Sequence, residues 1–475
     1  MSQSTNLVYN VEDKPGWGKT IVFALQQLLA ILAATIAVPA IIGHGMSPSA
    51  ALFGAGVGTL VYLLFTKFKS PVFLGSSFAF IGSMFAAFGG AVSASAGYLG
   101  LIIGAALAAL VYCAIALAVK LAGTKWINKI MPAIVIGPTV AIIGLSLAGN
   151  AVGDLLTGPA YETTNELGEI VIANNTWLGL FCGLITLFVT MGVSCYGKKL
   201  LKMIPFIFGI LAGYLVASIF TGIGWAAGND SLKVIDFSKF ANMEWLPRFT
   251  FIEAFNGFKD FQDAGQFFEY FGALIVAYVP VAFVVFAEHI ADHKNLGSII
   301  GRDLLTEPGL HRTLLGDGIG SAAGAFFGGC PNTTYGESVG TVAISGNASI
   351  RTIVVTAFMA IVLSFIAPFS TFLSTIPSCV MGGVCIALYG FIAVSGLKMI
   401  QKSDLSDNRN LFVVSVILIA GIGGLTVTIR KITLTAVACA LILGILTNIF
   451  LHIKKKSPDE PEQAPVEAVE PQNAD

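Results

Sequence analysis

The sequence predicts an all-α polytopic membrane protein with about fourteen transmembrane segments in a seven-plus-seven inverted repeat. Hydrophobic residues make up 55% of its 475 residues and charged residues only 11%, whereas a soluble domain carries about 25% charged residues. Apolar runs of roughly 20 residues, long enough to cross a bilayer as helices, recur from Thr20 to His452. These runs lack the polar–apolar alternation of a transmembrane barrel.

The predicted spans are the apolar segments of the chain. They cover residues 20–42, 49–66, 71–89, 98–122, 130–149, 176–195, 203–224, 267–292, 311–330, 332–346, 352–372, 376–397, 410–427 and 433–452. The spans at 71–89 and 332–346 are short, Gly-rich and polar at their start, so we expect them to be irregular. No signal peptide is expected at the N-terminus, and the acidic, Pro-rich residues 454–475 are predicted to form a disordered tail.

Lys and Arg residues in the short loops predict the orientation of the chain. They gather in alternate loops, whereas the loop 150–176 has acidic residues but no basic ones. With an even number of spans, both termini are then expected in the cytoplasm. Arg430 and Lys431 are an exception, because they fall on the predicted outer side. Aromatic residues in the long connection 225–266 predict interfacial helices there.

Two pairs of similar segments predict the inverted repeat. MPAIVIGPTVAIIGL, from Met131, resembles IPSCVMGGVCIALYG, from Ile376, and SPVFLGSSF, from Ser70, resembles CPNTTYGES, from Cys330. Each pair is separated by seven spans, and an odd number of spans inserts the second unit upside down. Corresponding Gly- and Pro-interrupted segments in two such halves point to the binding site of a transporter.

The stretch after Cys330 predicts a half-helix that begins inside the membrane. Pro331 removes a backbone N–H group and restricts the residue before it, and residues 332–334 favour extended backbone. The helix is therefore expected to begin near Gly336, and the same argument applies to residues 75–78. Irregular backbone at membrane depth survives only against protein or a wet cavity. We expect two half-helix N-termini to face each other across a pocket lined with N–H donors.

Glu337 and Phe78 predict the kind of ligand that this pocket takes. A carboxylate at Glu337 repels anions and accepts hydrogen bonds from ligand N–H groups, while the backbone donors suit carbonyl oxygens. A planar pyrimidine or purine base offers both kinds of group, and Phe78 would give its ring a stacking face. The alternative for Glu337 is a structural cap of the helix.

The stretch FAEHIADH, from Phe286, predicts a proton-carrying group. Glu288 and Asp292 lie one helical turn apart on one face, and ionisable residues inside a membrane are functional candidates by default. Because neighbouring carboxylates do not both ionise easily, one of them is expected to hold a proton. Alternatively, Asp292 and His293 mark the helix end in water. We expect His289 to pack or to form a local hydrogen bond, and Asp317 to be an entry cap or a partner in the charge network.

The chain resembles the nucleobase–ascorbate transporter (nucleobase:cation symporter-2) family over nearly its whole length. The matching stretches are LQQLLAILAATIAVP (25–39), GSSFAFI (75–81), AEHI (287–290), DLLTEPGLHRTLLGDG (303–318), FFGGCPNTTYGESVG (326–340) and IPSCVMGGV (376–384). Their combination is similar to the uracil-type members more than to the xanthine- or ascorbate-type members. Gln27 departs from the usual Gln-His pair of the family, so a role for His at that position does not transfer.

The resemblance implies a core domain and a gate domain, with proton symport and usually homodimers. The core would comprise residues 1–122 and 267–372 and the gate residues 123–224 and 373–453, with an extracytoplasmic loop at 225–266. Glu288 and Glu337 would accept hydrogen bonds from the base, and the backbone of Phe78 and Gly336 would bind its oxygens. Ser77 and Tyr335 complete the predicted substrate site. The predicted proton-coupling residues are Glu288, Asp292 and Asp317.

We therefore expect a proton-coupled importer of uracil in the cytoplasmic membrane, working by alternating access. A purine or xanthine permease is the first alternative, and an anion transporter of the same architecture or a nucleobase sensor is a weaker one. The chain shows no nucleophile–base set, nucleotide loop or metal-ligand spacing, so an enzyme is not expected. Its seven cysteines are scattered, and we expect no disulfide, metal, cofactor or nucleic acid; the proton is the coupling ion, and lipid surrounds the protein.

Overall fold

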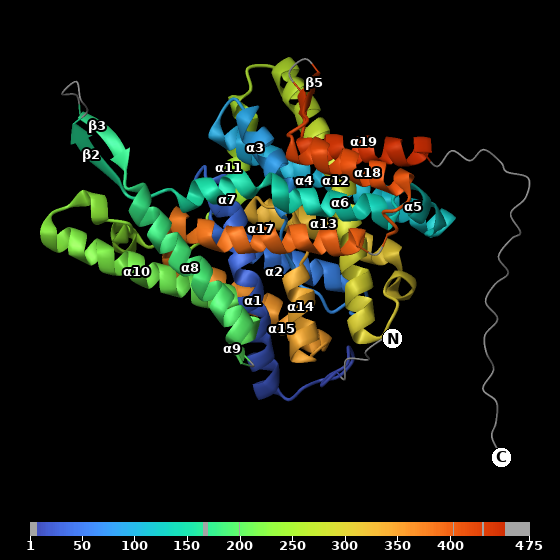
Figure 1. Ribbon diagram of the computed structural model, residues 1–475, viewed down its shortest axis with the longest axis horizontal. Helices are drawn as coiled ribbons and strands as arrows, with labels where there is room; N and C mark the ends of the chain where they lie inside the picture. The colour runs from blue at the N-terminus through green and yellow to red at the C-terminus, as the bar shows by residue number, and fades with distance from the viewer. Residues whose placement is uncertain (1–6, 165–169, 199, 402, 430–431, 452–475) are drawn as a thin grey trace, which may run out of the picture.

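A computed structural model describes residues 7–164, 170–198, 200–401, 403–429 and 432–451, and it is mainly helical (Figure 1). Within these residues, eight helices are long and apolar enough to cross a membrane, or nine if one bent pair counts as a single span. Three shorter apolar helices cover 78–89, 408–422 and 436–451. The predicted class of polytopic α-helical membrane protein is confirmed, whereas the number of fourteen spans is not.

The first half of the chain runs from α1 to α10. Its elements are α1 (Trp17–Ile42), α2 (Pro48–Phe65), β1 (Leu74–Ser76), η1 (Phe78–Phe80), α3 (Ile81–Gly89), α4 (Ala94–Ala122), α5 (Lys125–Ile130), α6 (Ala133–Ser146), α7 (Ala148–Leu155), β2 (Ala160–Thr164), β3 (Ile170–Asn174), α8 (Thr176–Tyr196), α9 (Leu200–Met203) and α10 (Pro205–Ala227).

A connection of short helices leads to the second half. The connection holds η2 (Asp230–Leu232), η3 (Phe237–Asn242), α11 (Thr250–Gly257) and η4 (Phe258–Asp260). The second half holds α12 (Ala264–Ile300), η5 (Leu305–Gly309), α13 (Leu310–Gly328), β4 (Asn332–Thr334), α14 (Gly336–Ser345), α15 (Ile350–Ser364), α16 (Ala367–Thr375), α17 (Ser378–Ile400), α18 (Asn408–Ile422), β5 (Val427–Ile429), β6 (Ile432–Leu434) and α19 (Ala436–Leu451).

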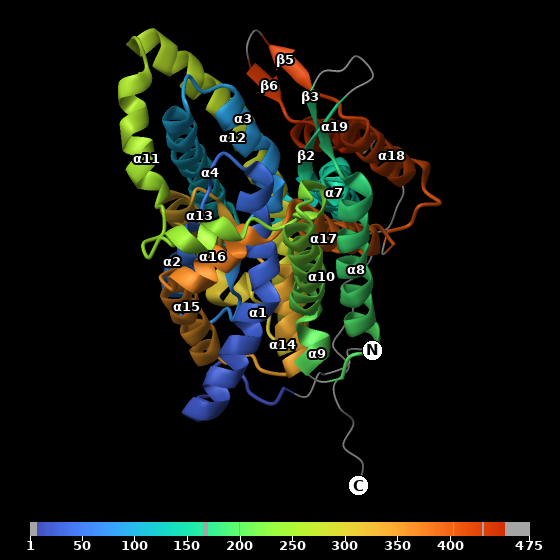
Figure 2. The ribbon, with the colours of Figure 1, turned by 90° about the vertical axis from the view of Figure 1, so that its left-hand side faces the viewer.

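The helices pack in two groups that lie side by side (Figure 2). In one group α13 packs against α2 and α4, and α15 packs against α1 and α2. In the other group α17 packs against α6, α7 and α8, and α18 packs against α6 and α19. The long helix α12 contacts α3 and α4 of the first group and α6 and α19 of the second. The division into a core and a gate domain stays a prediction.

Close helix packing in the first group depends on glycine. A Cβ atom added to Gly54 would lie 2.4 Å from the Gly324 carbonyl oxygen, and one added to Gly58 would lie 2.7 Å from the Gly320 oxygen. Such small residues let the backbones of α2 and α13 approach each other, as in other membrane helix pairs.

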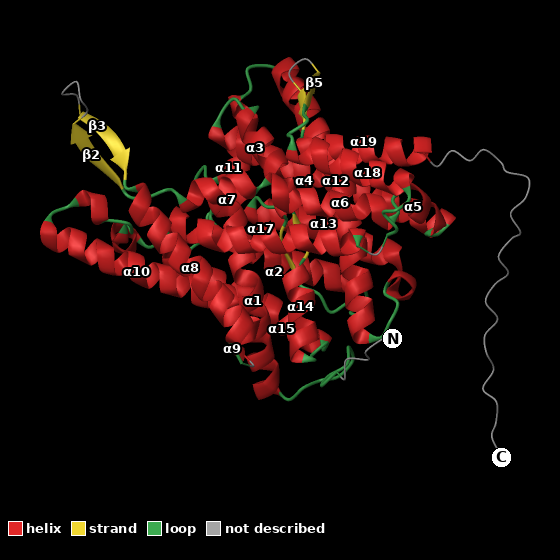
Figure 3. Ribbon diagram, viewed as in Figure 1, coloured by secondary structure: helices red, strands yellow, loops and turns green. Residues whose placement is uncertain are grey.

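Strands are few and short beside the helices (Figure 3). The central pair is β1 with β4, which run antiparallel with Leu74 opposite Thr334 and Ser76 opposite Asn332. Each strand leads into a half-helix, η1 with α3 after β1, and α14 after β4. The predicted extended stretches and the start of a helix at Gly336 are therefore confirmed. The antiparallel pair also places the two interrupted segments in opposite directions, as the inverted repeat predicts.

Several predicted boundaries were wrong. The span predicted at 352–372 is broken into α15 and α16, which are bent by 83°, because Pro368 has no N–H group to continue α15 and instead stands in the first turn of α16. The span predicted at 267–292 continues to Ile300 in α12. The span predicted at 130–149 reaches from Ala133 to Leu155 through α6 and α7. Arg430, Lys431 and the tail 454–475 lie outside the described residues.

Candidate functional site

A cavity of about 360 Å³ lies beside the β1–β4 pair, between α12, α14 and α17. Its lining includes most of the residues predicted to bind substrate, namely Phe78, Glu288, Tyr335, Gly336 and Glu337, together with Asp292. Phe391, Ile392 and Ser395 of α17 line the other side. A volume of this size is typical of a small-molecule pocket.

Three carboxylic acids line this cavity. Glu288 and Asp292 lie one turn apart on α12, and Glu337 is the second residue of α14. All three side chains are half-buried. The Thr334 hydroxyl donates a 2.8 Å hydrogen bond to Asp292 Oδ2, so Asp292 is tied to the end of β4. Glu288 and Glu337 thus meet in one cavity, as the predicted mode of ligand binding requires.

The half-helix starts supply polar backbone groups on the same side of the cavity. The first turn of a helix leaves its backbone N–H groups without intrahelical partners, and it carries the positive end of the helix dipole. Phe78 begins η1 and Gly336 begins α14. A Cβ added to Gly336 would meet only Asp292 Oδ1, at 4.0 Å, so a ligand can approach this backbone closely.

Aromatic rings shape the cavity. Phe78 packs edge-to-face against Tyr389 of α17, with ring centroids 5.5 Å apart. The Tyr335 hydroxyl donates a 2.7 Å hydrogen bond to the Ser76 carbonyl oxygen. This bond lays the Tyr335 ring over Gly75, where an added Cβ would lie 2.2 Å from the ring. Any larger residue at position 75 would therefore have to displace this hydrogen-bonded ring.

Two predicted site residues do not line the cavity. Ser77 is fully buried, and its backbone N–H donates a 2.8 Å hydrogen bond to the Pro331 carbonyl oxygen. The Asp317 side chain is 1% exposed, and its Oδ2 atom lies 2.7 Å from Nδ1 of His289. Asp317 is not an entry cap, because α13 begins at Leu310, about two turns earlier. His289 Nε2 also lies 2.9 Å from the Thr313 hydroxyl. His289 is thus packed and hydrogen-bonded, but its partners lie on α13 and are not local.

His293 was expected at a helix end in water, and this expectation was wrong. Its side chain is 1% exposed, its Nε2 lies 2.7 Å from the Tyr62 hydroxyl, and its Nδ1 lies 2.8 Å from the His289 carbonyl oxygen. The His289 and His293 rings stack with centroids 3.9 Å apart. One feature of the sequence could have indicated this burial: the pairs Glu288-His289 and Asp292-His293 are four residues apart, so equivalent members of each pair share a helix face. One face of α12 carries the acids, and the adjoining face carries the two imidazoles.

Gln27 is a second residue whose position the sequence did not reveal. It is 3% exposed, and its side-chain amide lies 2.5 Å from the Ser338 hydroxyl in the first turn of α14.

In the described part of the chain, no group of three or more His, Cys, Asp and Glu side chains is arranged to hold a metal ion.

Two oppositely directed half-helices that meet beside a polar cavity, within a bundle of membrane-spanning helices, define a membrane transporter. The chain belongs to the permease family, because the sequence model of that family matches residues 18–430. It is thus a multi-pass membrane permease and not an enzyme.

Relatives of similar length extend this assignment. The chain is 37% identical over 447 residues to the uracil permease of Bacillus caldolyticus, covering 94% of each chain. It is 36% identical over 460 residues to the uracil permease of Bacillus subtilis (strain 168), covering 95% of this chain and 97% of the relative. It is 34% identical over 459 residues to the uracil permease of Escherichia coli (strain K12), covering 96% of this chain and 97% of the relative.

Solved structures share the fold. The transmembrane domain of the cyanobacterium bicarbonate transporter BicA has a TM-score of 0.59 at 15% identity, covering 95% of this chain and 100% of that domain. The murine anion transporter Slc26a9 in the inward-facing state has a TM-score of 0.61 at 12% identity, covering 93% of this chain and 69% of that protein. At these identities the similarity concerns the architecture alone.

Proposed function

We propose that this permease imports uracil together with a proton by alternating access. The relatives named uracil permeases support the choice of substrate. The single observation that carries the proposal is the meeting of Glu288, Glu337 and two half-helix starts around one cavity. Each of these groups complements one part of the edge of a uracil ring.

Recognition follows from hydrogen-bond polarity. Uracil has two ring N–H groups and two carbonyl oxygens. The Glu288 and Glu337 carboxylates accept from the N–H groups, while the backbone N–H groups at Phe78 and Gly336 donate to the oxygens. The Phe78 ring, held by Tyr389, stacks on the base. Hydrogen bonds to a charged partner contribute roughly 1.5–3 kcal/mol each.

Proton coupling uses the pair of acids on α12. Glu288 and Asp292 share one face of the helix and one cavity, and two adjacent carboxylates resist simultaneous ionisation. One proton bound by this pair removes a charge that would otherwise remain in the cavity when the site closes. Protonation therefore favours both the binding of a neutral base and the movement of the loaded site.

The transport movement is assigned to the two helix groups. The cavity lies between α12 and α14 of the proposed core and α17 of the proposed gate. Lys202 and Ile344 at its edge belong to the end of the molecule that the charge pattern predicts to be cytoplasmic. We infer a cytoplasmic-membrane protein with both termini inside, open inward in this conformation. We also propose that the permease forms a homodimer, as the family resemblance implies.

Uptake of radiolabelled uracil into proteoliposomes tests the proposal. With an imposed pH gradient, acidic on the side from which uracil enters, the wild type should accumulate uracil, and dissipation of the gradient should abolish accumulation. Glu288→Gln should lose accumulation while the purified variant keeps its monodisperse elution profile. Unlabelled uracil should compete much better than xanthine. Accumulation that ignores the gradient, or that persists in Glu288→Gln, would contradict the mechanism.

A further inference from the structure

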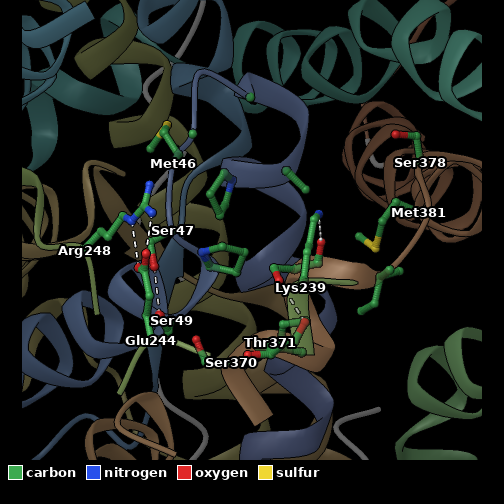
Figure 4. A pocket seen from close by; sticks show the side chains of 18 of the residues that line it. Met46, Ser47, Ser49, Lys239, Glu244, Arg248, Ser370, Thr371, Ser378 and Met381 are labelled. Atoms are coloured by element: carbon green, nitrogen blue, oxygen red, sulfur yellow. Dashed lines mark hydrogen bonds and ion pairs between the residues drawn. The ribbon is translucent and has the colours of Figure 1, made fainter. Parts of the chain in front are cut away.

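A larger cavity than the one around Glu288, of about 730 Å³, lies around the end of α1 and the start of α2 (Figure 4); we call it the outer cavity and the cavity around Glu288 the inner cavity. The outer cavity is formed by the end of α1, the start of α2, the connection around η3, and α16 with the start of α17. The charge pattern predicts that the end of α1 faces outward. The cavity is therefore on the side from which uracil would arrive.

The helices α1 and α17 each line both cavities. Pro39 of α1 lines the outer cavity and Ala30 lines the inner one, a separation of about 13 Å along a helix. On α17, Met381 lines the outer cavity and Phe391 the inner one, about 15 Å apart. Five apolar residues lie between these positions on the two helices and are fully buried, namely Ala33, Ala34, Ala37, Val384 and Leu388. This buried apolar stretch, the apolar closure, separates the residues that line the two cavities.

Most charged groups of the outer cavity have partners. Arg248 Nε donates a 2.7 Å hydrogen bond to Glu244 Oε2, and a second bond joins the same two side chains. Figure 4 shows this pair at one wall of the cavity. Lys239 Nζ donates a 2.8 Å hydrogen bond to the Ser374 carbonyl oxygen. An ammonium group has three N–H donors, so Lys239 keeps two for a ligand.

Asp154 of α7 is the exception. Its side chain lines the outer cavity and is half-buried, and among the described residues it forms no ion pair with Lys, Arg or His. Its helix, α7, packs against α17, which carries Tyr389, the residue that contacts the Phe78 ring of the inner site. A half-buried carboxylate without a cation is costly to desolvate and is a ready acceptor for a ligand donor.

We propose that the outer cavity is an entry site for the nucleobase, in which Asp154 accepts an N–H group of the ring and Lys239 donates to a neighbouring carbonyl oxygen. Acceptor and donor in one polar cavity complement the imide edge of uracil, where an N–H group lies between two carbonyl oxygens. The entry site captures the base from outside, and the base moves to the inner site when the apolar closure opens. This inference rests on the proposed function.

Influx kinetics of the full-length protein in proteoliposomes test the entry site. Loss of the acceptor in Asp154→Asn should raise the KM for external uracil roughly tenfold and leave kcat within about twofold. Asp154→Glu, which keeps a carboxylate, should restore most of the affinity, and Lys239→Met should shift KM in the same direction as Asp154→Asn. The Kd of purified protein for uracil, measured by calorimetry, should stay within about twofold of the wild type, because the inner site is intact.

The matched control is Glu253→Gln, which removes an exposed carboxylate of α11 outside the cavity and should leave KM unchanged. An unchanged KM in Asp154→Asn would overturn the entry site. So would an equal rise in KM and in the Kd of purified protein, because the effect would then act on the inner site. A wild type that takes up no uracil would instead overturn the proposed function itself, so the two failures are distinguishable.

Discussion

Gln27 of α1 donates a hydrogen bond of 2.5 Å to the hydroxyl group of Ser338, the residue that follows Glu337 in α14. The same hydroxyl oxygen accepts a 2.9 Å hydrogen bond from the backbone N–H of Phe73, just before β1. The Ser338 hydroxyl oxygen therefore links three parts of the fold: α1, the residue before β1, and the first turn of α14. This contact positions Glu337 relative to both interrupted segments.

Ser338→Ala should destabilise the protein and weaken uracil binding. The change leaves two buried donors, the Gln27 amide and the Phe73 N–H, without an acceptor, and each loss costs about 1–3 kcal/mol. Thermal unfolding in detergent and calorimetric uracil binding measure the two effects. Ser218→Ala is the matched control, because among the described residues the Ser218 hydroxyl bonds only the Tyr214 carbonyl oxygen, within α10. Equal unfolding temperatures for Ser338→Ala and the wild type would contradict the bridging role.

Gly75→Ala should abolish uracil binding, and the folded yield should fall. The added methyl group would lie 2.2 Å from the Tyr335 ring, so this buried ring would have to leave the place beside the cavity in which its hydrogen bond to Ser76 holds it. Size-exclusion profiles and uracil binding measure the outcome. Gly192→Ala in α8, where an added Cβ meets nothing within 4 Å, should keep both properties. Normal binding by Gly75→Ala would show that the site tolerates a displaced Tyr335 ring.

Glu337→Gln should weaken uracil binding by about 10- to 100-fold, while the fold is retained. The amide keeps the shape of the side chain but replaces a charged acceptor by a neutral one, and a hydrogen bond to a charged group is worth roughly 1.5–3 kcal/mol. Calorimetry with purified protein measures the change. If Glu337 were only a cap of α14, the variant would lose stability and keep its affinity for uracil.

Asp317→Ala should destabilise the fold. It removes the hydrogen-bond partner of His289 Nδ1, and both side chains are at most 1% exposed, so the unsatisfied buried group should cost about 1–3 kcal/mol. Asp317→Asn keeps a hydrogen-bonding side chain and should lose less. A stable Asp317→Ala protein that transports uracil without responding to a pH gradient would instead support the predicted role of Asp317 in proton coupling.

Glu12→Gln should have a small, pH-dependent effect on stability. A hydrogen bond from Arg302 lowers the pKa of Glu12 below its usual value, so the pair stabilises the fold above the unfolded-state pKa of roughly 4.3. This stabilisation is lost as the pH falls through the lower folded-state pKa. Because the pair is largely exposed, it is worth about 1 kcal/mol or less. Unfolding temperatures of variant and wild type should differ slightly at pH 7, and less in high salt or at pH 3.

The periodicity and chemistry of the sequence were enough to predict the membrane class and the two interrupted segments. Pro331 and residues 332–334 carry their own backbone preferences, so β4 and the start of α14 at Gly336 could be predicted from local chemistry. The i, i+4 spacing of Glu288 and Asp292 also places both on one helix face in any fold. These are local properties, and the structure places both acids in one cavity with Glu337.

Tertiary packing decided the rest. The sequence could not reveal that His293 is buried against Tyr62, that Asp317 faces His289, or that Gln27 reaches Ser338, because each contact joins residues far apart in the chain. It also could not separate a single span at 352–372 from two helices bent at 83°, since hydropathy averages over a break. Local preference and hydropathy belong to each segment alone, whereas burial and hydrogen-bond partners depend on which segments the fold brings together.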